Sequence, residues 1–356
     1  MTTICQHAKK SVLYPERTKA TLKTREVQKL IAVVQKGGAG RLNNTIAIIG
    51  IGRVGATTAY TLLLKNLVAN LLLVDVNEER CEGEVRDLAD ALAFLPAAHI
   101  RQASYSEART ADIIIICAGF AQSNAKETRL NLAQKNRPIV EQIIKNLEPI
   151  PPHTIIILVT NPVDIMTTFA QRATQKAKNH IFGSGTWLDT QRLRRYTGEI
   201  LAIAPESIDA FVIGEHGDAQ CVAWSQTLVG GTPLSTNMLN TEQRNAIALK
   251  AKNEVYAIIE KKCATFFGVA ACVADMCQAI IFDEKRVLPV SCYQPEYNLC
   301  LSMPAVLGKE GIERMLPITL SPNETKTLAQ SAQSMHSFIE ELSSTTASSH
   351  TKNRDS

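Results

Sequence analysis

The chain has 356 residues, of which 45% are hydrophobic and 20% charged. At roughly 150 residues per domain, this length predicts two domains that can bury cores without disulfide bonds. The composition excludes a disordered chain, and the lack of any apolar run of about 20 residues excludes a membrane-spanning helix. The nine cysteines form no Cys-x-x-Cys pair or Cys/His cluster. We therefore expect free thiols, a cytoplasmic location and no bound metal.

Charge is unevenly distributed along the chain, whose net charge is +4. Residues 1–44 contain nine basic and two acidic side chains, a balance of +7, whereas the remaining 312 residues contain 29 basic and 32 acidic side chains, a balance of −3. A basic chain indicates a nucleic-acid partner only where the charge forms a patch on a folded body. We therefore predict a basic N-terminal arm at 1–44 and no nucleic-acid or membrane partner.

The two ends of the chain are expected to lie outside the folded domains. Apolar residues approximate helical spacing over 18–34 and are followed by the glycine-rich breaker 37–40, which predicts an arm helix on a hinge. A transit peptide and a nucleic-acid-binding tail are the alternatives for this segment. Residues 343–356 are rich in Ser and Thr and contain no aromatic side chain, so we expect a disordered tail.

A glycine-rich turn near residue 50 predicts a dinucleotide site. The β-rich run Thr45–Ile49 enters this turn, and a helical pattern follows it. Gly50 permits a tight bend, Gly52 lets the backbone approach a pyrophosphate, and Gly55 lets helix and strand pack closely. The N-terminus of the helix then offers unpaired N–H groups and a partial positive charge to the phosphates. The residues predicted to contact the cofactor here are Gly50, Gly52, Arg53, Val54 and Gly55.

The next predicted strand, 71–75, ends in a carboxylate. Asp75 lies 25 residues after Gly50, close to the spacing at which an acid accepts hydrogen bonds from the hydroxyls of the adenine ribose. A carboxylate at this place repels a 2′-phosphate. We therefore predict NAD as the cofactor, rather than NADP.

Two further runs of β-branched residues, 112–117 and 154–160, alternate with helical patterns. Such alternation predicts an α/β fold with a Rossmann-type, doubly wound parallel sheet that is covered on both faces. We assign this sheet to a dinucleotide-binding domain at 45–182 and expect a second, α+β substrate domain at 183–335. Ligands of such sheets bind at the carboxyl ends of the strands.

Polar residues cluster where these strands end. Residues 118–129 have the length of a mobile lid over the cofactor and contain Gln122 and Arg129. Asn161 follows a predicted strand and precedes a proline. Its amide either faces the ligand crevice or caps the next helix.

Three patterns in the second half carry further polar groups. Asp189 and Arg192 share one face of a predicted helix, for which a plain surface salt bridge is the simplest interpretation. His216 stands between glycines, which leave room for a substrate beside its ring. Thr265 lies in a predicted helix, where its hydroxyl either reaches a pocket or bonds to its own backbone.

Taken together, these motifs resemble those of the L-lactate/malate dehydrogenase family, from about Thr45 to about Leu320. The loop that carries Gln122 is similar to the lactate branch of the family, and Ala20–Lys23 is similar to the N-terminal arm of its tetrameric members. The motifs that carry the resemblance are the glycine turn, Asn161–Asp164, Gly183–Thr186, Leu188–Arg192 and Gly214–Asp218.

The resemblance implies catalytic roles for three residues. His216 would exchange a proton with the keto oxygen of pyruvate while hydride passes between NADH and the substrate carbon, giving L-lactate. Asp189 would orient the imidazole and raise its pKa. Arg129 would polarise the carbonyl from the lid.

The resemblance also implies a set of binding residues. Arg192 would hold the substrate carboxylate with its planar guanidinium. Asn161 and Thr265 would line the pocket, with Asn161 near the reacting centre and the cofactor. Gln122 would select the substrate, because a neutral amide suits pyruvate, whereas the second carboxylate of oxaloacetate would need a cation under the lid.

The sequence thus predicts a cytoplasmic, homotetrameric enzyme of glycolysis and pyruvate fermentation. The lid departs from the family pattern at 124–126, where it has one extra residue and no glycine. Three alternatives therefore stay open: an enzyme of the family that acts on malate, one that acts on 2-hydroxyisocaproate, and a catalytically idle NAD-binding or assembly protein.

Overall fold

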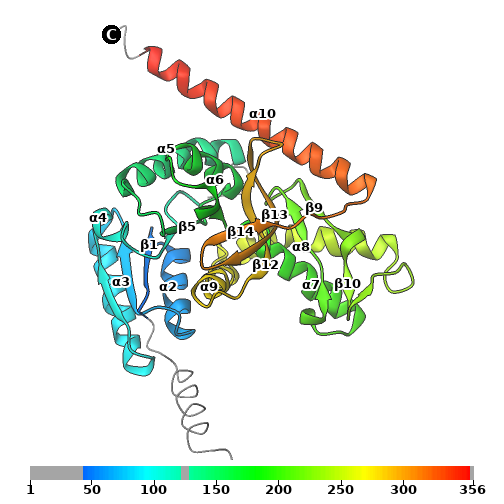
Figure 1. The fold of residues 1–356 in the computed structure, drawn as a ribbon, viewed down its shortest axis with the longest axis horizontal. Helices are drawn as coiled ribbons and strands as arrows, with labels where there is room; N and C mark the ends of the chain where they lie inside the picture. The colour runs from blue at the N-terminus through cyan, green and yellow to red at the C-terminus, as the bar shows by residue number, and fades with distance from the viewer. Residues whose placement is uncertain (1–42, 122–127, 353–356) are drawn as a thin grey trace, which may run out of the picture. The chain divides into compact units, whose positions relative to one another are not determined.

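The structure is a computed structural model that describes residues 43–121 and 128–352, with side chains described up to residue 342 (Figure 1). The predicted arm helix at 18–34, its hinge and Gln122 lie outside the described residues. In the described part of the chain, no helix is long and apolar enough to cross a membrane.

The predicted parallel sheet is confirmed in the first half of the chain. Its inner strands are nearly continuous apolar runs, such as Ile113–Ile116, whose side chains are buried on both faces, whereas the edge strand His99–Gln102 is polar and partly exposed. The order of the strands reverses between β1 and β4, which places a ligand crevice beside the glycine turn. In spatial order the parallel strands are β3 (His99–Gln102), β2 (Asn70–Val74), β1 (Thr45–Ile49), β4 (Ile113–Ile116), β5 (Ile155–Leu158) and β6 (Ile181–Gly183).

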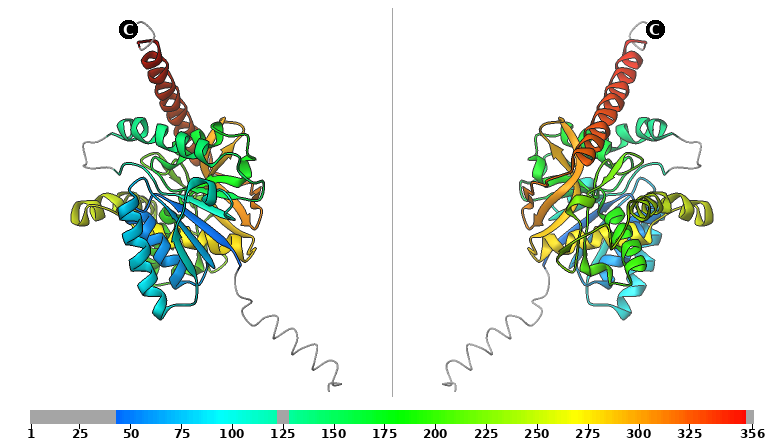
Figure 2. Two further views of the ribbon diagram at one scale, coloured as in Figure 1. Left: turned by 90° about the vertical axis from the view of Figure 1, so that its left-hand side faces the viewer. Right: turned by 90° about the vertical axis from the view of Figure 1, so that its right-hand side faces the viewer.

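Helices cover both faces of this sheet, as the side views in Figure 2 show. Alternate residues of β1 enter different cores, with Ile46 and Ile48 on one face and Ala47 and Ile49 on the other. The first face packs against α2 (Arg53–Leu64), α3 (Glu78–Ala91) and α9 (Phe267–Ile281). The second packs against α4 (Tyr105–Ala108), α5 (Arg129–Leu147), α6 (Val163–Arg172) and α10 (Pro322–Lys352).

The second half of the chain extends the same sheet with antiparallel strands. β12 pairs with β6 through Ser291 and Gly183. β8 ends at Gly214, which lies opposite Ser302 of β13, so the turn that carries His216 follows directly from the sheet. The antiparallel strands are β8 (Val212–Gly214), β9 (Gln220–Val222), β12 (Arg286–Gln294), β13 (Leu299–Gly308) and β14 (Gly311–Met315).

The other elements of the second half pack beside this extended sheet and complete its α+β character. A small antiparallel sheet consists of β7 (Ile208–Asp209), β10 (Leu228–Val229) and β11 (Thr232–Pro233). It shares a core with α7 (Trp187–Leu201) and α8 (Thr241–Lys262). Short 3₁₀ helices occur at Leu92–Phe94, Lys178–His180, Pro205–Ser207 and Trp224–Gln226.

The C-terminal segment differs from the prediction. Helix α10 continues to Lys352, through most of the stretch 343–356 that we expected to be disordered. No glycine or proline follows Pro322, so the sequence contains no residue that would break the helix earlier. Residues 353–356 lie outside the described part.

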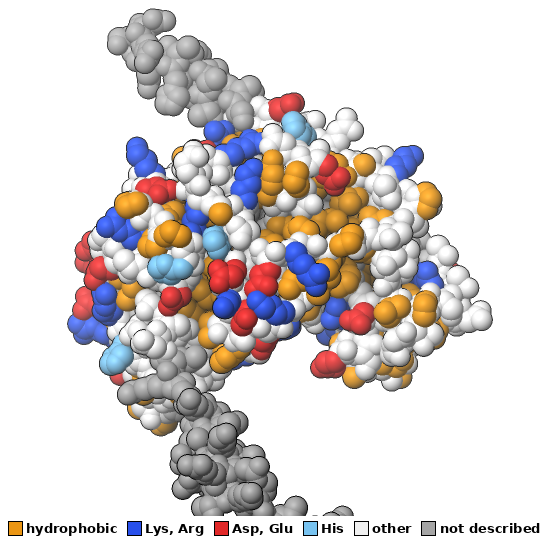
Figure 3. All heavy atoms as spheres, viewed as in Figure 1, with side chains coloured by type: hydrophobic (Ala, Val, Ile, Leu, Met, Phe, Trp, Pro, Cys, Tyr) orange, Lys and Arg blue, Asp and Glu red, His pale blue; other side chains and the backbone are white. Residues whose placement is uncertain are grey.

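Acidic and basic side chains lie next to one another on the face of the body drawn in Figure 3. Ion pairs among the described residues include Lys285 with Asp283 at 2.7 Å and Arg286 with Glu284 at 3.5 Å. This mixed surface fits the balance of −3 that the sequence assigns to residues 45–356.

The fold predicts a large difference between two Phe→Ala substitutions. Phe182 lies in β6, where the parallel and antiparallel parts of the sheet meet, and is fully buried. Its replacement by Ala should lower the free energy of unfolding by about 3–5 kcal/mol through lost burial and an internal cavity. Phe282 is 53% exposed. Phe282→Ala should therefore leave urea unfolding, followed by tryptophan fluorescence, almost unchanged, and equal midpoints for the two variants would contradict this.

Candidate active site

The glycine turn lies between β1 and α2, at the carboxyl end of the parallel strands. Gly50 has a φ of +91°, and a Cβ there would lie 2.4 Å from the backbone of Ala118. A Cβ on Gly55 would lie 2.1 Å from the carbonyl oxygen of Gly50, so both positions require glycine. Gly52 is surrounded by open space and caps α2 without a side-chain hydrogen bond. The amides of the first helical turn are therefore left for a ligand, and the turn fits a dinucleotide pyrophosphate.

Asp75 follows β2 and braces the glycine turn. Its Oδ2 accepts a hydrogen bond from the N–H of Ile51 at 2.6 Å, and its Oδ1 accepts one from the N–H of Asn77 at 2.9 Å. Each carboxylate oxygen has a further lone pair, so both bonds are compatible with a bond from a ribose hydroxyl. The predicted contact of Asp75 with NAD stays a prediction. In the structure, the Asp75 carboxylate also stabilises the glycine turn through its hydrogen bond to Ile51.

A cavity of about 410 Å³ extends from the glycine turn to the turn that carries His216 and to α8. Gly50, Asp75 and Arg192 are not among the described residues that line it. The predicted site residues that do line it are Gly52, Arg53, Val54, Gly55, Arg129, Asn161, Asp189, His216 and Thr265.

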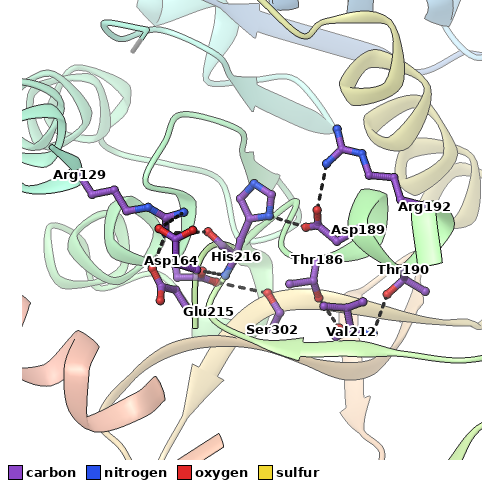
Figure 4. Close-up of polar contacts among 11 residues, drawn as sticks. Arg129, Asp164, Thr186, Asp189, Thr190, Arg192, Val212, Glu215, His216 and Ser302 are labelled. Carbon is purple, nitrogen blue, oxygen red and sulfur yellow. Dashed lines mark hydrogen bonds and ion pairs between the residues drawn. The ribbon is translucent and has the colours of Figure 1, made fainter. Parts of the chain in front are cut away.

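His216 and Asp189 form a hydrogen-bonded pair in this cavity. Nδ1 of His216 lies 2.6 Å from Oδ2 of Asp189 (Figure 4). Because a carboxylate only accepts, Nδ1 carries the proton, which leaves Nε2 as the atom that can exchange a proton with a ligand. The two side chains come from different elements, since Asp189 lies in the first turn of α7 and His216 follows β8.

The surroundings of this pair favour its charged forms. Burial alone lowers the pKa of His216, but the charge and hydrogen bond of Asp189, and then the charge of Asp164, raise it above its usual value. Burial alone raises the pKa of Asp189, but the contacts with His216 and Arg192 bring it below its usual value. The pair therefore favours a protonated imidazole beside an ionised carboxylate.

Arg192 pairs with the other oxygen of Asp189. Its Nη1 donates to Oδ1 of Asp189 at 3.0 Å, and its side chain is 10% exposed. The i,i+3 salt bridge considered from the sequence is thus present, but it is buried beside the histidine rather than on the surface. Because Arg192 does not line the cavity as described, its grip on a substrate carboxylate stays a prediction.

Arg129 begins α5 and reaches the turn that carries His216. Its Nη1 forms an ion pair with Glu215 and donates to the carbonyl oxygen of His216 at 3.3 Å, while its Nη2 lies 3.7 Å from Asp218. A Cβ on Gly217 would lie 1.6 Å from Nη1 of Arg129. Glycine at 217 therefore makes room for the guanidinium.

The lid that should hold Gln122 is described only at its two ends. Thr128 caps α5, and Phe120 is bonded to Asn136, a buried side chain that the sequence did not single out. Asn136 accepts from the N–H of Phe120 at 2.7 Å and donates to the carbonyl oxygens of Phe120 at 3.0 Å and Asn161 at 2.8 Å. One amide thus ties the root of the lid to the strand-end residue Asn161.

Asn161 and Thr265 both line the cavity. One of the two alternatives for Asn161 is absent, and the expectation that Thr265 lies in a helix was wrong. Asn161 does not cap the next helix, because α6 is capped by Pro162 without a side-chain hydrogen bond. Thr265 lies between α8 and α9 rather than in a helix. Cys263 has a φ of +66°, which ends α8 two residues before Thr265.

Sequence reasoning also missed Asp164, which bonds to the backbone of His216. Its Oδ2 accepts from the N–H of His216 at 2.6 Å, although the two residues are 52 positions apart. The only sequence signal was its place in the motif that starts at Asn161.

Metal ligation finds no support in the described part of the chain, where no group of three His, Cys, Asp or Glu side chains is arranged to hold an ion. The eight cysteines of that part are free thiols. Burial raises the pKa of Cys117 to about 12, so this thiol beside the cavity is not a nucleophile at neutral pH.

Comparison with known proteins covers both halves of the chain. Residues 44–183 match the lactate/malate dehydrogenase NAD binding domain, and residues 186–346 match the lactate/malate dehydrogenase alpha/beta C-terminal domain. L-lactate dehydrogenase A of Rhizopus oryzae is 40% identical over 305 residues, which cover 85% of this chain and 94% of that protein. An L-lactate dehydrogenase of Halalkalibacterium halodurans is 36% identical over 297 residues, with 82% and 95% covered.

Solved structures give the same result. A lactate dehydrogenase from a Medee basin deep-sea metagenome library superposes with a TM-score of 0.80 at 30% identity, covering 85% of this chain and 99% of that one. A minor L-lactate dehydrogenase from Enterococcus mundtii gives a TM-score of 0.80 at 31% identity, with 84% and 98% covered. The chain therefore belongs to the lactate/malate dehydrogenase family and is an NAD-dependent oxidoreductase.

Proposed function

We propose that the chain is an L-lactate dehydrogenase, which reduces pyruvate to L-lactate with NADH and catalyses the reverse reaction. The observation that carries this proposal is the His216–Asp189 pair, which faces the cavity that begins at the glycine turn. Such a pair supplies a proton at the place where a substrate can lie beside the cofactor. The names of the relatives support the choice of substrate within the family.

The proposed reaction divides its work between the cofactor and the protein. The keto carbon would receive the hydride that bound NADH supplies, and Nε2 of His216 would donate a proton to the keto oxygen. Asp189 stabilises the imidazolium before the transfer and holds the ring afterwards. Pyruvate reduction needs protonated His216, so its rate falls as the pH rises through the raised pKa of the ring. Lactate oxidation needs the neutral ring, so its rate rises over the same pH range.

Two arginines would bind the negatively charged oxygens of the substrate. We assign Arg192 to the carboxylate of pyruvate, because its guanidinium is already oriented by Asp189. We assign Arg129 to the carbonyl oxygen, where negative charge develops as hydride arrives. Asn161 and Thr265 line the same cavity and would limit the size of the substrate.

Gln122 is the proposed determinant of substrate choice. Beside a neutral amide, the methyl group of pyruvate would lie in uncharged surroundings, whereas the second carboxylate of oxaloacetate would be buried without a cation. We further propose that residues 45–182 bind NAD and that residues 183–335 supply the acid/base His216 and the carboxylate-binding Arg192.

The cellular setting is part of the proposal. Free thiols in the described part fit a cytoplasmic enzyme of glycolysis and pyruvate fermentation. Ala20–Lys23 resembles the arm of tetrameric relatives, which supports a homotetramer, although this segment lies outside the described residues.

Steady-state kinetics with NADH tests the proposed substrate. Pyruvate should give a kcat/KM at least about tenfold above that of oxaloacetate or 2-ketoisocaproate, because a neutral Gln122 suits the small methyl group of pyruvate and brings no cation for a second carboxylate. His216→Asn should lower pyruvate reduction by about 10²–10⁴-fold while NADH still binds. Preference for oxaloacetate would overturn the part given to Gln122, and an active His216→Asn would overturn the mechanism. Absence of turnover by wild-type protein that binds NADH would indicate an idle NAD-binding protein.

A pair of Gly→Ala substitutions tests the part proposed for Arg129. Gly217→Ala should displace the guanidinium from the cavity and lower kcat/KM for pyruvate by about 100-fold. Stability should change little, because the Cβ meets the end of a flexible side chain. Gly83→Ala is the matched control, since Gly83 lies in α3 with nothing within 4 Å of an added Cβ. Equal kinetics for Gly217→Ala and Gly83→Ala would contradict the proposed role of Arg129 at the carbonyl oxygen.

A further inference from the structure

Asp164 is a buried carboxylate that the mechanism has not used. It lies in the first turn of α6 and is 2% exposed. A carboxylate inside a protein is costly unless hydrogen bonds and favourable charges compensate it. The N-terminus of α6 provides a partial positive charge for it. Two hydrogen bonds add to this compensation, and one of them connects Asp164 to the proposed acid/base.

Both oxygens of Asp164 have partners on other elements (Figure 4). Oδ2 accepts from the backbone N–H of His216 at 2.6 Å. Oδ1 accepts from the hydroxyl of Ser302 in β13 at 3.3 Å. Ser302 also lies opposite Gly214, the last residue of β8. One side chain therefore joins α6, β13 and the turn that carries the histidine.

The neighbouring residue of this turn is held in a similar way. The N–H of Glu215 donates to the hydroxyl of Ser331 in α10 at 3.2 Å. The backbone N–H groups of Glu215 and His216 thus both donate to buried side chains, while the ring of His216 is held by Asp189. The backbone bond to Asp164 fixes the point from which the imidazole projects.

We propose that Asp164 is a positioning residue for the acid/base His216: it anchors the histidine backbone through Oδ2, and its negative charge favours the imidazolium. This inference rests on the proposed function of His216. Asp164 does not touch the substrate, so its effect passes through the position and the proton affinity of the imidazole.

The charge of Asp164 acts together with several others. The pKa of Asp164 itself is raised to about 6, chiefly by burial and in part by Glu215, although the amide and charge of His216 lower it. The charges of Asp164 and His216 therefore favour each other, so the titration of one affects that of the other. The charged or titratable groups that face His216 or Asp164 are Asp189 and Arg192 of α7, Arg129 of α5, Glu215 and Asp218 of the turn, Lys252 and Tyr256 of α8, Cys292 of β12 and Cys300 of β13.

Two variants separate the hydrogen bond from the charge. Asp164→Asn keeps an oxygen that can accept from His216 and removes only the charge. Its kcat for pyruvate reduction at pH 6 should stay within about threefold of wild type, while the alkaline limb of the pH profile moves down by roughly 0.5–1 unit. Asp164→Ala also removes the acceptor, and its kcat should fall by about 100-fold with little change in the KM for NADH.

Asp112 provides the matched control. Its Oδ2 likewise accepts from a backbone N–H, that of Thr45 at 2.8 Å, but it lies at the amino end of β4, away from the cavity. Asp112→Asn should leave the pH profile unchanged. A wild-type alkaline limb in Asp164→Asn, or a wild-type kcat in Asp164→Ala, would each overturn the proposal.

A measurement without turnover keeps the proposal testable if the variants do not fold and separates it from the proposed function. In wild-type protein with ¹⁵N-labelled histidine, the imidazole signal that is missing in His216→Asn should shift in two steps with pH. One step is its own titration and the smaller one, near pH 6, is that of Asp164. A single step would contradict the coupling even in an active enzyme, whereas two steps without pyruvate turnover would reject only the proposed function.

Discussion

The buried carboxylate of Asp189 is the constraint on which the site depends. It is 3% exposed, and it divides its two oxygens between the ring of His216 and the guanidinium of Arg192. An uncompensated carboxylate in such surroundings would bind a proton, so both cationic partners are needed to keep it ionised. The same carboxylate fixes the tautomer of His216 and orients the guanidinium of Arg192. One residue of α7 thereby connects the proposed proton donor with the proposed anchor for the substrate carboxylate.

The fold brings this pair together by fastening α7 to β8. The hydroxyl of Thr186 donates to the carbonyl oxygen of Val212, and the hydroxyl of Thr190 accepts from the N–H of Val212 at 2.9 Å (Figure 4). Both threonines are fully buried. Asp189 lies between them in sequence, and His216 follows Val212 by one short turn. The position of Asp189 relative to His216 is therefore supported by hydrogen bonds between two threonine hydroxyls and the backbone of Val212.

Local sequence signals predicted the parallel half of the sheet and its glycine turn, because strands buried on both faces and left-handed glycines leave clear patterns. They also placed Asp189, Arg192 and His216 in the right elements. They did not show that Asp189 and Arg192 are buried, since an i,i+3 spacing is the same on a surface. Contacts across long stretches of chain, such as Asp164 with His216, leave no periodic signal. Thr265 was misplaced because the left-handed conformation at Cys263 is carried by a residue that seldom adopts it.

The central claim is that Asp189 raises the pKa of His216, and the pH dependence of pyruvate reduction by Asp189→Asn tests it most directly. The amide keeps the shape of the side chain but removes its charge. The account predicts that kcat/KM at pH 7 falls by about 10²–10⁴-fold and that the alkaline limb moves to lower pH. A variant with the wild-type rate and the wild-type alkaline limb would contradict it.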